Sequence, residues 1–170
     1  MTDDTVETLA IGNLNGEFFC EQFLDPASRS RATGDLARFG AEAVPVLAAF
    51  FRGETSNRFG VPYYRLGQSV DCALVVVTML GPTARPLEPY VVVELRHGHP
   101  YAPSALGALG SLEELSVIAL ADRLGEKGEL AYHSAVALVQ CAATHHPYVE
   151  AVVNASSAAA GTIAAATARA

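Results

Sequence analysis

Histidine and tyrosine recur in two similar short segments, and these residue types can bind metals or transfer protons. The tripeptide His-Pro-Tyr occurs at 99–101 and again at 146–148, and a further histidine, His97 or His145, precedes each copy. Imidazole nitrogens are common ligands of zinc, and they also act as general acids and bases. Two such segments brought together could therefore form a divided metal or catalytic site.

Other residues with catalytic potential are scattered. The sequence contains no G-x-S-x-G, Walker loop, H-E-x-x-H or G-x-G-x-x-G motif. Asp71, Glu88 and Glu94 are carboxylates that could act as acids or bases, but solvated helix faces supply such residues routinely. No catalytic residue is therefore assigned from the sequence, and no cofactor is expected.

The composition is that of a single packed domain. The chain has 170 residues, of which 51% are hydrophobic and 17% charged. A net charge of −7 without any run of Lys or Arg argues against a nucleic-acid partner. The first ten residues are acidic where a secretory signal would be basic, and no apolar run approaches the roughly 20 residues of a membrane span. We therefore expect a cytoplasmic protein that binds neither nucleic acid nor membrane.

The three cysteines are widely spaced and form no C-x-x-C pair, which predicts buried reduced thiols instead of disulfides or a zinc knuckle. They are Cys20, Cys72 and Cys141.

A repeated pattern organises the chain. Three segments, 31–47, 72–87 and 101–115, each carry an alanine, apolar residues four and seven positions later, and then a glycine. The members are Ala32, Leu36, Phe39 and Gly40; Ala73, Val77, Leu80 and Gly81; and Ala102, Leu106, Leu109 and Gly110. A weaker fourth unit has Ser134, Leu138, Cys141 and Ala142 at the same positions. A proline stands five residues after the last position in three of the four units: Pro45, Pro86 and Pro147.

This spacing predicts helical hairpins. Positions 0, 4 and 7 share one face of a helix, and a glycine at the next position ends that helix in a left-handed C-cap. A proline then fits the first turn of a second helix. Hairpins with one apolar face must stack to bury it, so we expect an all-α fold, a short right-handed α-solenoid of about four helical hairpins with an N-terminal capping helix.

The expected elements follow from the phase of the repeat. Phe18, Phe19, Phe23 and Leu24 are expected to cover the first hairpin. The serine at 111 is the expected N-cap of a helix that follows it. Two β-branched runs, 74–78 and 90–95, could instead form strands, but both keep the repeat phase. The expected ranges are 14–24 for the capping helix, 26–52, 64–97, 101–125 and 129–153 for the hairpins, and 154–170 for an Ala-rich tail that is either loosely docked or frayed.

The pattern resembles the HEAT-like repeat family, including the short bacterial units first associated with phycobilisome lyases. Their signature is an Ala-x-x-x-Leu-x-x-Leu-Gly first helix followed by a second helix that opens with proline. The resemblance covers about residues 29–153 and implies the solenoid architecture. It implies little about function, because the family includes scaffolds, inhibitors, lyases and nucleic-acid enzymes. The Asp and Arg common in such units are mostly absent here, as in a divergent member.

The repeat phase separates the two His-Pro-Tyr segments. Residues 99–101 fall between repeats and 146–148 fall inside one, and these two kinds of connection lie on opposite edges of stacked hairpins. A metal site shared by the two segments is therefore disfavoured, and we expect none. Proline and histidine in these positions are interpreted mainly as turn residues.

One edge collects residues typical of a binding surface, because every connection between repeats lies along it. The candidate binding residues are Arg52, Asn57, Arg58, Tyr63, Tyr64 and Arg65 in the long first connection, His97, His99 and Tyr101 in the second, and Tyr132 and His133 after the third. Alternatively, the tyrosines could seal the helix pairs with their rings buried.

Two hypotheses about function follow. The first is an interaction module that binds a protein partner, as an accessory protein or an immunity-type inhibitor would. The alternative is a small, cofactor-independent enzyme of the lyase or cyclase type, acting on an organic ligand by proton transfer from the Tyr/His/Arg edge. The lack of a catalytic constellation favours the first. An apolar pocket closed by the 53–64 loop would favour the enzyme, and an open apolar patch would favour the module.

Overall fold

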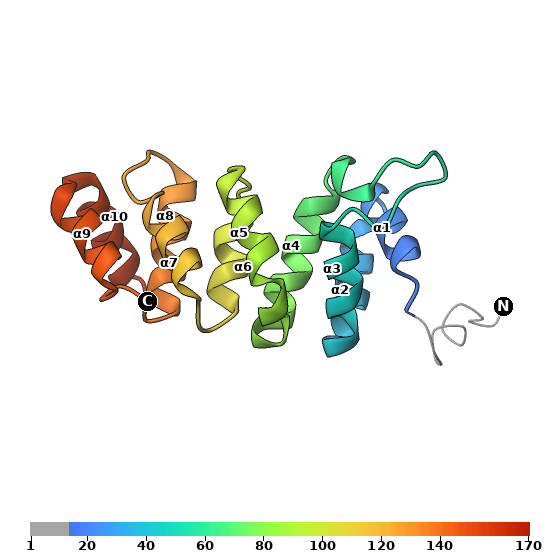
Figure 1. The fold of residues 1–170 in the computed structure, drawn as a ribbon, viewed down its shortest axis with the longest axis horizontal. Helices are drawn as coiled ribbons and strands as arrows, with labels where there is room; N and C mark the ends of the chain where they lie inside the picture. Colours follow the sequence, from blue (N-terminus) through green and yellow to red (C-terminus); the bar gives the residue numbers. More distant parts are fainter. Residues whose placement is uncertain (1–13) are drawn as a thin grey trace.

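The computed structural model describes residues 14–170, and the regular structure in this part of the chain is helical (Figure 1). The α-helices are α1 (Gly16–Leu24), α2 (Arg29–Arg38), α3 (Ala43–Phe51), α4 (Ser69–Leu80), α5 (Glu88–Arg96), α6 (Ala102–Ala108), α7 (Glu114–Ala121), α8 (Glu129–Gln140), α9 (Pro147–Ala155) and α10 (Ser157–Thr167). Short 3₁₀ helices span Gly40–Glu42, Tyr63–Arg65 and Gly81–Leu87. The all-helical prediction is confirmed for these residues, and the runs 74–78 and 90–95 are helical, not strands.

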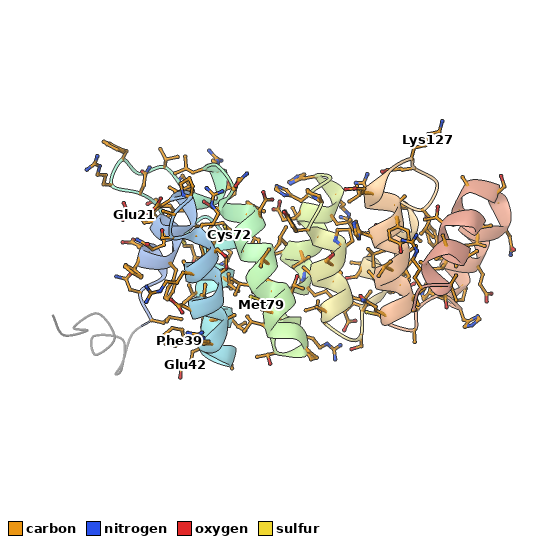
Figure 2. All side chains as sticks on the ribbon, turned by 180° about the vertical axis from the view of Figure 1, so that it is seen from behind. Glu21, Phe39, Glu42, Cys72, Met79 and Lys127 are labelled. Carbon is orange, nitrogen blue, oxygen red and sulfur yellow. The ribbon has the colours of Figure 1, made fainter. Side chains whose placement is uncertain are left out.

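The helices form two rows along the long axis of the molecule (Figure 1). In one row α2, α4, α6, α8 and α10 each contact the next. In the other, α3 contacts the 3₁₀ helix Gly81–Leu87, α5 contacts α7, and α7 contacts α9. The connections between rows therefore lie on two opposite edges, which Lys127 and Glu42 mark in Figure 2.

The positions that close each first helix share an unusual backbone conformation. Gly40, Gly81 and Gly110 have positive φ angles of 57°, 57° and 80°. Ala142 has φ 52° and is the sole non-glycine residue with positive φ in the described part of the chain. A positive φ after each first helix is thus confirmed, at Ala142 without a glycine, but Gly81 combines it with a ψ of −135° and so does not form the predicted left-handed cap.

The apolar positions of the pattern build the core. Leu36, Val77, Leu106 and Leu138 are fully buried. Between α6 and α8 the backbones approach closely at Gly107, where an added Cβ would lie 3.2 Å from Cα of Ala137. The row of first helices is therefore held together by aliphatic side chains and by one close backbone contact.

The two ends of the row differ in part from the sequence prediction. Phe19 and Phe23 are buried, but Phe18 is 49% exposed, so its predicted role in covering the first hairpin is wrong. The reason is helical phase, because residues 19 and 23 are four apart and share the buried face of α1, while residue 18 lies on another face. The tail, predicted as docked or frayed, is helix α10, which contacts α8 and α9.

The start of α7 also differs from the prediction. Ser111 was the expected cap, but the helix begins at Glu114. Its first turn is capped by Glu88 of α5, whose carboxylate accepts hydrogen bonds from the backbone N–H of Glu113 at 2.7 Å and from the hydroxyl of Ser116. A side chain from a neighbouring helix has replaced the local cap.

One helical stretch is longer and more apolar than the sequence pattern predicts. The helical segment Ser69–Arg96 is long and apolar enough to cross a membrane, and so is the pair α9 and α10, which is bent by 120°. The first segment, however, is interrupted by the positive φ of Gly81, and half of its most apolar window is buried inside the protein. Buried core helices meet the same criteria, so length and composition alone do not indicate a span.

Candidate functional site

The connection between α3 and α4 projects beyond the helices at one end of the molecule (Figure 1). Its tip is held by the side chain of Asn57, whose Oδ1 accepts hydrogen bonds from the backbone N–H groups of Phe59 at 2.9 Å and Val61 at 3.0 Å. The backbone N–H of Asn57 donates to the carbonyl of Val61 at 2.9 Å, and Gly60 has φ 76°. The tip is therefore a built turn with a fixed backbone.

The base of this loop is anchored in the core. Tyr63 is buried, and its backbone N–H donates to the carbonyl of Thr55 at 3.0 Å. The ring of Tyr64 lies so close to Gly53 that an added Cβ there would be 2.7 Å from Cε1 of the ring. Burial raises the pKa of the Tyr63 hydroxyl above its ordinary value. Tyr63 is thus a structural anchor, as the alternative interpretation of the tyrosines predicted.

The tip carries apolar side chains that contribute nothing to the core. Phe59 is 74% exposed and Val61 37% exposed. The guanidinium of Arg58 lies over the Phe59 ring, with its Cζ 4.8 Å from the ring centroid. Phe59 is not among the binding residues predicted from the sequence, although a phenylalanine beside an arginine in a long connection between helices is a usable signal.

Of the two remaining arginines of the loop edge, one is engaged within the protein. Arg52 binds the carboxylate of Glu54 through two nitrogens, at 2.6 and 2.8 Å, and donates to the Tyr90 hydroxyl at 3.4 Å. This contact lowers the pKa of Glu54 and raises that of Arg52. Arg65 instead donates to the hydroxyl of its neighbour Tyr64 at 2.9 Å. Arg52 is therefore structural, whereas Arg58 and Arg65 remain accessible.

His97 and His99 lie near two carboxylates. Nδ1 of His99 is 3.1 Å from Oδ1 of Asp71 at the start of α4, and its Nε2 is 3.7 Å from Oε2 of Glu94. Nδ1 of His97 is 3.9 Å from the same Glu94 oxygen. Both ring nitrogens of His99 thus face carboxylates, and the cluster ties the connection between α5 and α6 to α4. In the described part of the chain, no group of three or more His, Cys, Asp or Glu residues could hold a metal ion.

The second His-Pro-Tyr segment lies on the opposite edge, between α8 and α9 (Figure 1). There Nδ1 of His146 accepts a hydrogen bond from the backbone N–H of Tyr148 at 3.2 Å and so caps α9. The Tyr148 hydroxyl donates to Asp122 at 2.7 Å. This copy of the tripeptide is a helix cap, as the turn interpretation predicted.

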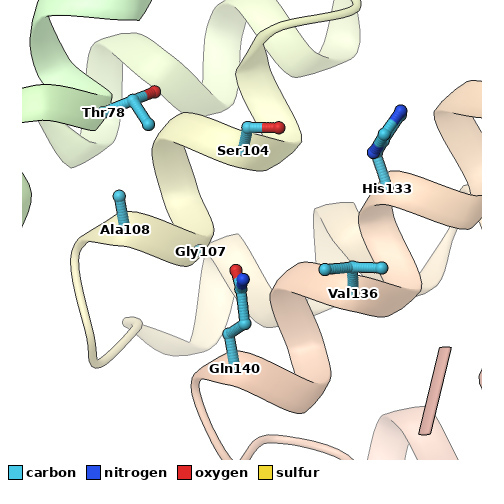
Figure 3. Close-up of a pocket in the computed structure, with 7 residues that line it drawn as sticks. All are labelled: Thr78, Ser104, Gly107, Ala108, His133, Val136 and Gln140. Carbon is cyan, nitrogen blue, oxygen red and sulfur yellow. The ribbon is translucent and has the colours of Figure 1, made fainter. Parts of the chain in front are cut away.

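Tyr132 and His133 lie apart from the loop, in the first turn of α8. Their rings meet edge to face, and the guanidinium of Arg169 lies 5.7 Å from the Tyr132 centroid. His133 also borders a hollow of about 230 Å³ on α4, α6 and α8 (Figure 3). Its other lining residues are Thr78, Ser104, Gly107, Ala108, Val136 and Gln140.

A second hollow of about 460 Å³ lies between α9, α10 and the preceding turn. Its lining includes Thr144, His145 and Ile163. Neither hollow is lined by a residue of the 53–64 loop, and the hollow in Figure 3 contains no carboxylate beside His133. The closed apolar pocket that would have favoured an enzyme is therefore not found at these two places.

The structure divides the candidate binding residues into three groups, with Tyr101 outside them. The loop residues 52–65 are joined through their own hydrogen bonds, His97 and His99 are joined to carboxylates, and Tyr132 is joined to His133 and Arg169. Tyr101, 46% exposed, precedes α6 on the same edge as the loop. The loop is the group in which an exposed apolar side chain and free cations coincide.

In comparisons with protein-family models, curated proteins and solved structures, no match to this chain was found.

Proposed function

We propose that this protein is a protein-interaction module of HEAT-like repeat architecture, a short solenoid of about four hairpins that binds a protein partner through the loop between α3 and α4. The architecture is supported by the two rows of helices and by the equivalent positive φ angles of Gly40, Gly81, Gly110 and Ala142. Such stacks hold long connections at one edge on a rigid support.

The observation that carries the function is the exposure of Phe59 on a fixed backbone. A phenylalanine that is 74% exposed gains almost nothing on folding. Covering it would contribute roughly 1.5–3 kcal/mol to binding. Because Asn57 already holds the turn, little conformational freedom would be lost on association. A rigid exposed aromatic is the usual form of an interaction anchor.

The shape of the loop favours a macromolecular partner over a small ligand. Small-molecule sites are concave and bury most of the ligand. The loop between α3 and α4 projects from the helices, and the two hollows described above lie elsewhere (Figure 1). A projecting anchor of this kind requires the partner to supply the pocket.

Site-specific photo-crosslinking in the native cell tests this function. A photoreactive phenylalanine analogue replaces Phe59 in one variant and Phe18 in a matched control, which is also an exposed phenylalanine but lies on α1. We expect a discrete crosslinked protein from position 59 and none from position 18. The Phe59→Ala variant should lose that partner in co-purification, while Phe18→Ala keeps it.

The contrary result is equally clear. If position 59 yields no crosslink above that of position 18, or if Phe59→Ala keeps the partner, the loop is not the binding surface. Thermal unfolding of both alanine variants serves as the folding control, and it should match that of the wild type, because surface substitutions usually change stability by less than about 0.5 kcal/mol.

A further inference from the structure

We infer that the pocket receiving Phe59 is an apolar pocket on a protein, rimmed by carboxylates that pair with Arg58 and Arg65. This inference rests on the proposed function and specifies the chemistry of the partner. It follows from the charges around the loop tip and from what each of them contacts.

The loop is cationic in an acidic protein. Between Glu54 and Asp71 the sequence contains two arginines, Arg58 and Arg65, and no acidic residue, although the whole chain has a net charge of −7. A local charge opposite to that of the molecule is unexpected for a segment whose only role is to connect two helices. It matters for recognition because partner surfaces are complementary in charge.

The two acidic residues that flank the loop in the sequence are turned toward other groups, and the remaining carboxylates near it, Glu17 and Glu21 of α1, act on Tyr63 at its base. Glu54 is bound by Arg52 at 2.6 Å, and Asp71 faces His99 at 3.1 Å. Neither Arg58 nor Arg65 forms an ion pair with any residue in the described part of the chain. The Arg58 guanidinium is therefore available for a carboxylate of another molecule, and Arg65, which uses only Nε in its hydrogen bond to Tyr64, keeps its two terminal nitrogens for the same purpose.

Arg58 is placed to act together with the aromatic anchor, whereas Arg65 lies beside Tyr64 at the base of the same loop. Arg58 lies over the face of the Phe59 ring, and Arg65 lies near the Tyr64 ring, with its Cζ 5.5 Å from the centroid. A pocket that covers Phe59 must pass within reach of the Arg58 guanidinium. Planar guanidinium groups pair with carboxylates through two parallel hydrogen bonds, so acidic side chains suit this rim.

Other occupants fit the observations less well. Nucleic acid requires several cations along its phosphates, whereas the loop carries two arginines on a molecule of charge −7.

Long-range repulsion between this acidic protein and an acidic partner is limited, because salt screens exposed charges beyond about 8 Å at physiological ionic strength. The contact therefore depends on the local charge of the tip.

The test uses a phage-displayed library of random disulfide-closed peptides as the probe. Peptides are selected on the immobilised wild-type protein after depletion on the Phe59→Ala variant. We expect the selected peptides to combine aliphatic or aromatic residues with Asp or Glu. A synthetic copy of the most enriched peptide is then titrated against purified variants by fluorescence anisotropy.

Charge variants separate this inference from the proposed function. Arg58→Ala and Arg65→Ala should each weaken peptide binding about tenfold, and Arg58→Glu about a hundredfold. Lys127→Glu is the control, because it reverses an exposed charge on the same edge, marked in Figure 2, outside the loop. The affinity of the Lys127→Glu variant for the peptide should stay within about twofold of that of the wild type.

Each other outcome is decisive. If Phe59→Ala abolishes binding while the arginine variants bind normally, the interaction module stands and the acidic rim is overturned. Selected peptides that are neutral or basic overturn the rim as well. If no selected peptide distinguishes the wild type from Phe59→Ala, both proposals fail. Tighter binding of a single-stranded 20-mer DNA, or dimerisation that depends on Phe59, would replace the acidic partner by nucleic acid or by a second copy.

Discussion

The carboxylate of Glu88 in α5 accepts a hydrogen bond from the backbone N–H of Glu113, 2.7 Å away at the start of α7. Glu88 is nearly fully buried, and it also accepts from the hydroxyl of the buried Ser116. One side chain therefore joins α5 to α7, and its loss would leave two donors without a partner.

We predict that Glu88→Ala lowers the free energy of unfolding by about 2–4 kcal/mol, because hydrogen bonds to a buried charged group are lost and a cavity forms. Glu88→Gln retains an acceptor and should lose less than half of that. Urea denaturation measures both. Glu114→Ala, an exposed substitution in the first turn of α7 beside the hydrogen bonds of Glu88, is the control and should change stability by less than about 0.5 kcal/mol. Equal stability of the Ala and Gln variants would contradict the capping role.

Ala142 offers a stabilising substitution. A non-glycine residue with φ 52° is strained by roughly 1 kcal/mol relative to glycine. We expect Ala142→Gly to raise the free energy of unfolding by up to about 1 kcal/mol, as measured by the urea midpoint. The same change in an exposed interior helical position, Ala164→Gly in α10, should instead lower it by a similar amount. A destabilised Ala142→Gly variant would show that the turn is not strained.

Asn57 is predicted to fix the loop tip without supporting the rest of the fold. In Asn57→Ala the backbone amides of Phe59 and Val61 lose their acceptor, so their hydrogen exchange should accelerate at least about tenfold. Asn57→Asp keeps the oxygen and should exchange like the wild type. The melting temperatures of both variants should stay within a few degrees of that of the wild type. Unchanged exchange in the Ala variant would mean that the tip is held by other contacts.

Cys20 should make stability depend on alkaline pH. Burial is the main cause that raises the pKa of its thiol from 9.0 to about 11. Below pH 9 the thiol is protonated in the folded and unfolded states, so it contributes no pH dependence. Between pH 9 and 11 the unfolded chain releases the proton first, and stability should fall by roughly 2–3 kcal/mol.

The measurement is the urea midpoint across this pH range, compared between the wild type and Cys20→Ala. The comparison separates the effect of the Cys20 thiol on stability from the effects of tyrosines that lose protons at alkaline pH. The difference in stability between the two proteins should shrink as the pH rises from 9 to 11. A constant difference would show that the thiol ionises equally in both states.

The sequence by itself determined the helical character of the chain and the phase of its first helices. Each of Leu36, Val77, Leu106 and Leu138 stands four residues after one position of the pattern and three before the next. This spacing is a local signal, because residues three and four apart meet on one helix face. Glycine at 40, 81 and 110 indicated turns of positive φ, because a residue without a Cβ adopts such a backbone conformation at little cost. Even Ala142, which carries no such local preference, was found from the phase of the other three units.

The tertiary structure decided which side chains are structural and which are free. Burial of Tyr63, the pairing of Arg52 with Glu54 and the contact of His99 with Asp71 all depend on partners that the one-dimensional pattern does not identify. Glu88 was indistinguishable in the sequence from a solvated carboxylate, and its partners lie 25 and 28 residues away. The exposure of Phe59 likewise follows from the projection of its loop, because a phenylalanine is buried or exposed according to what packs around it in space.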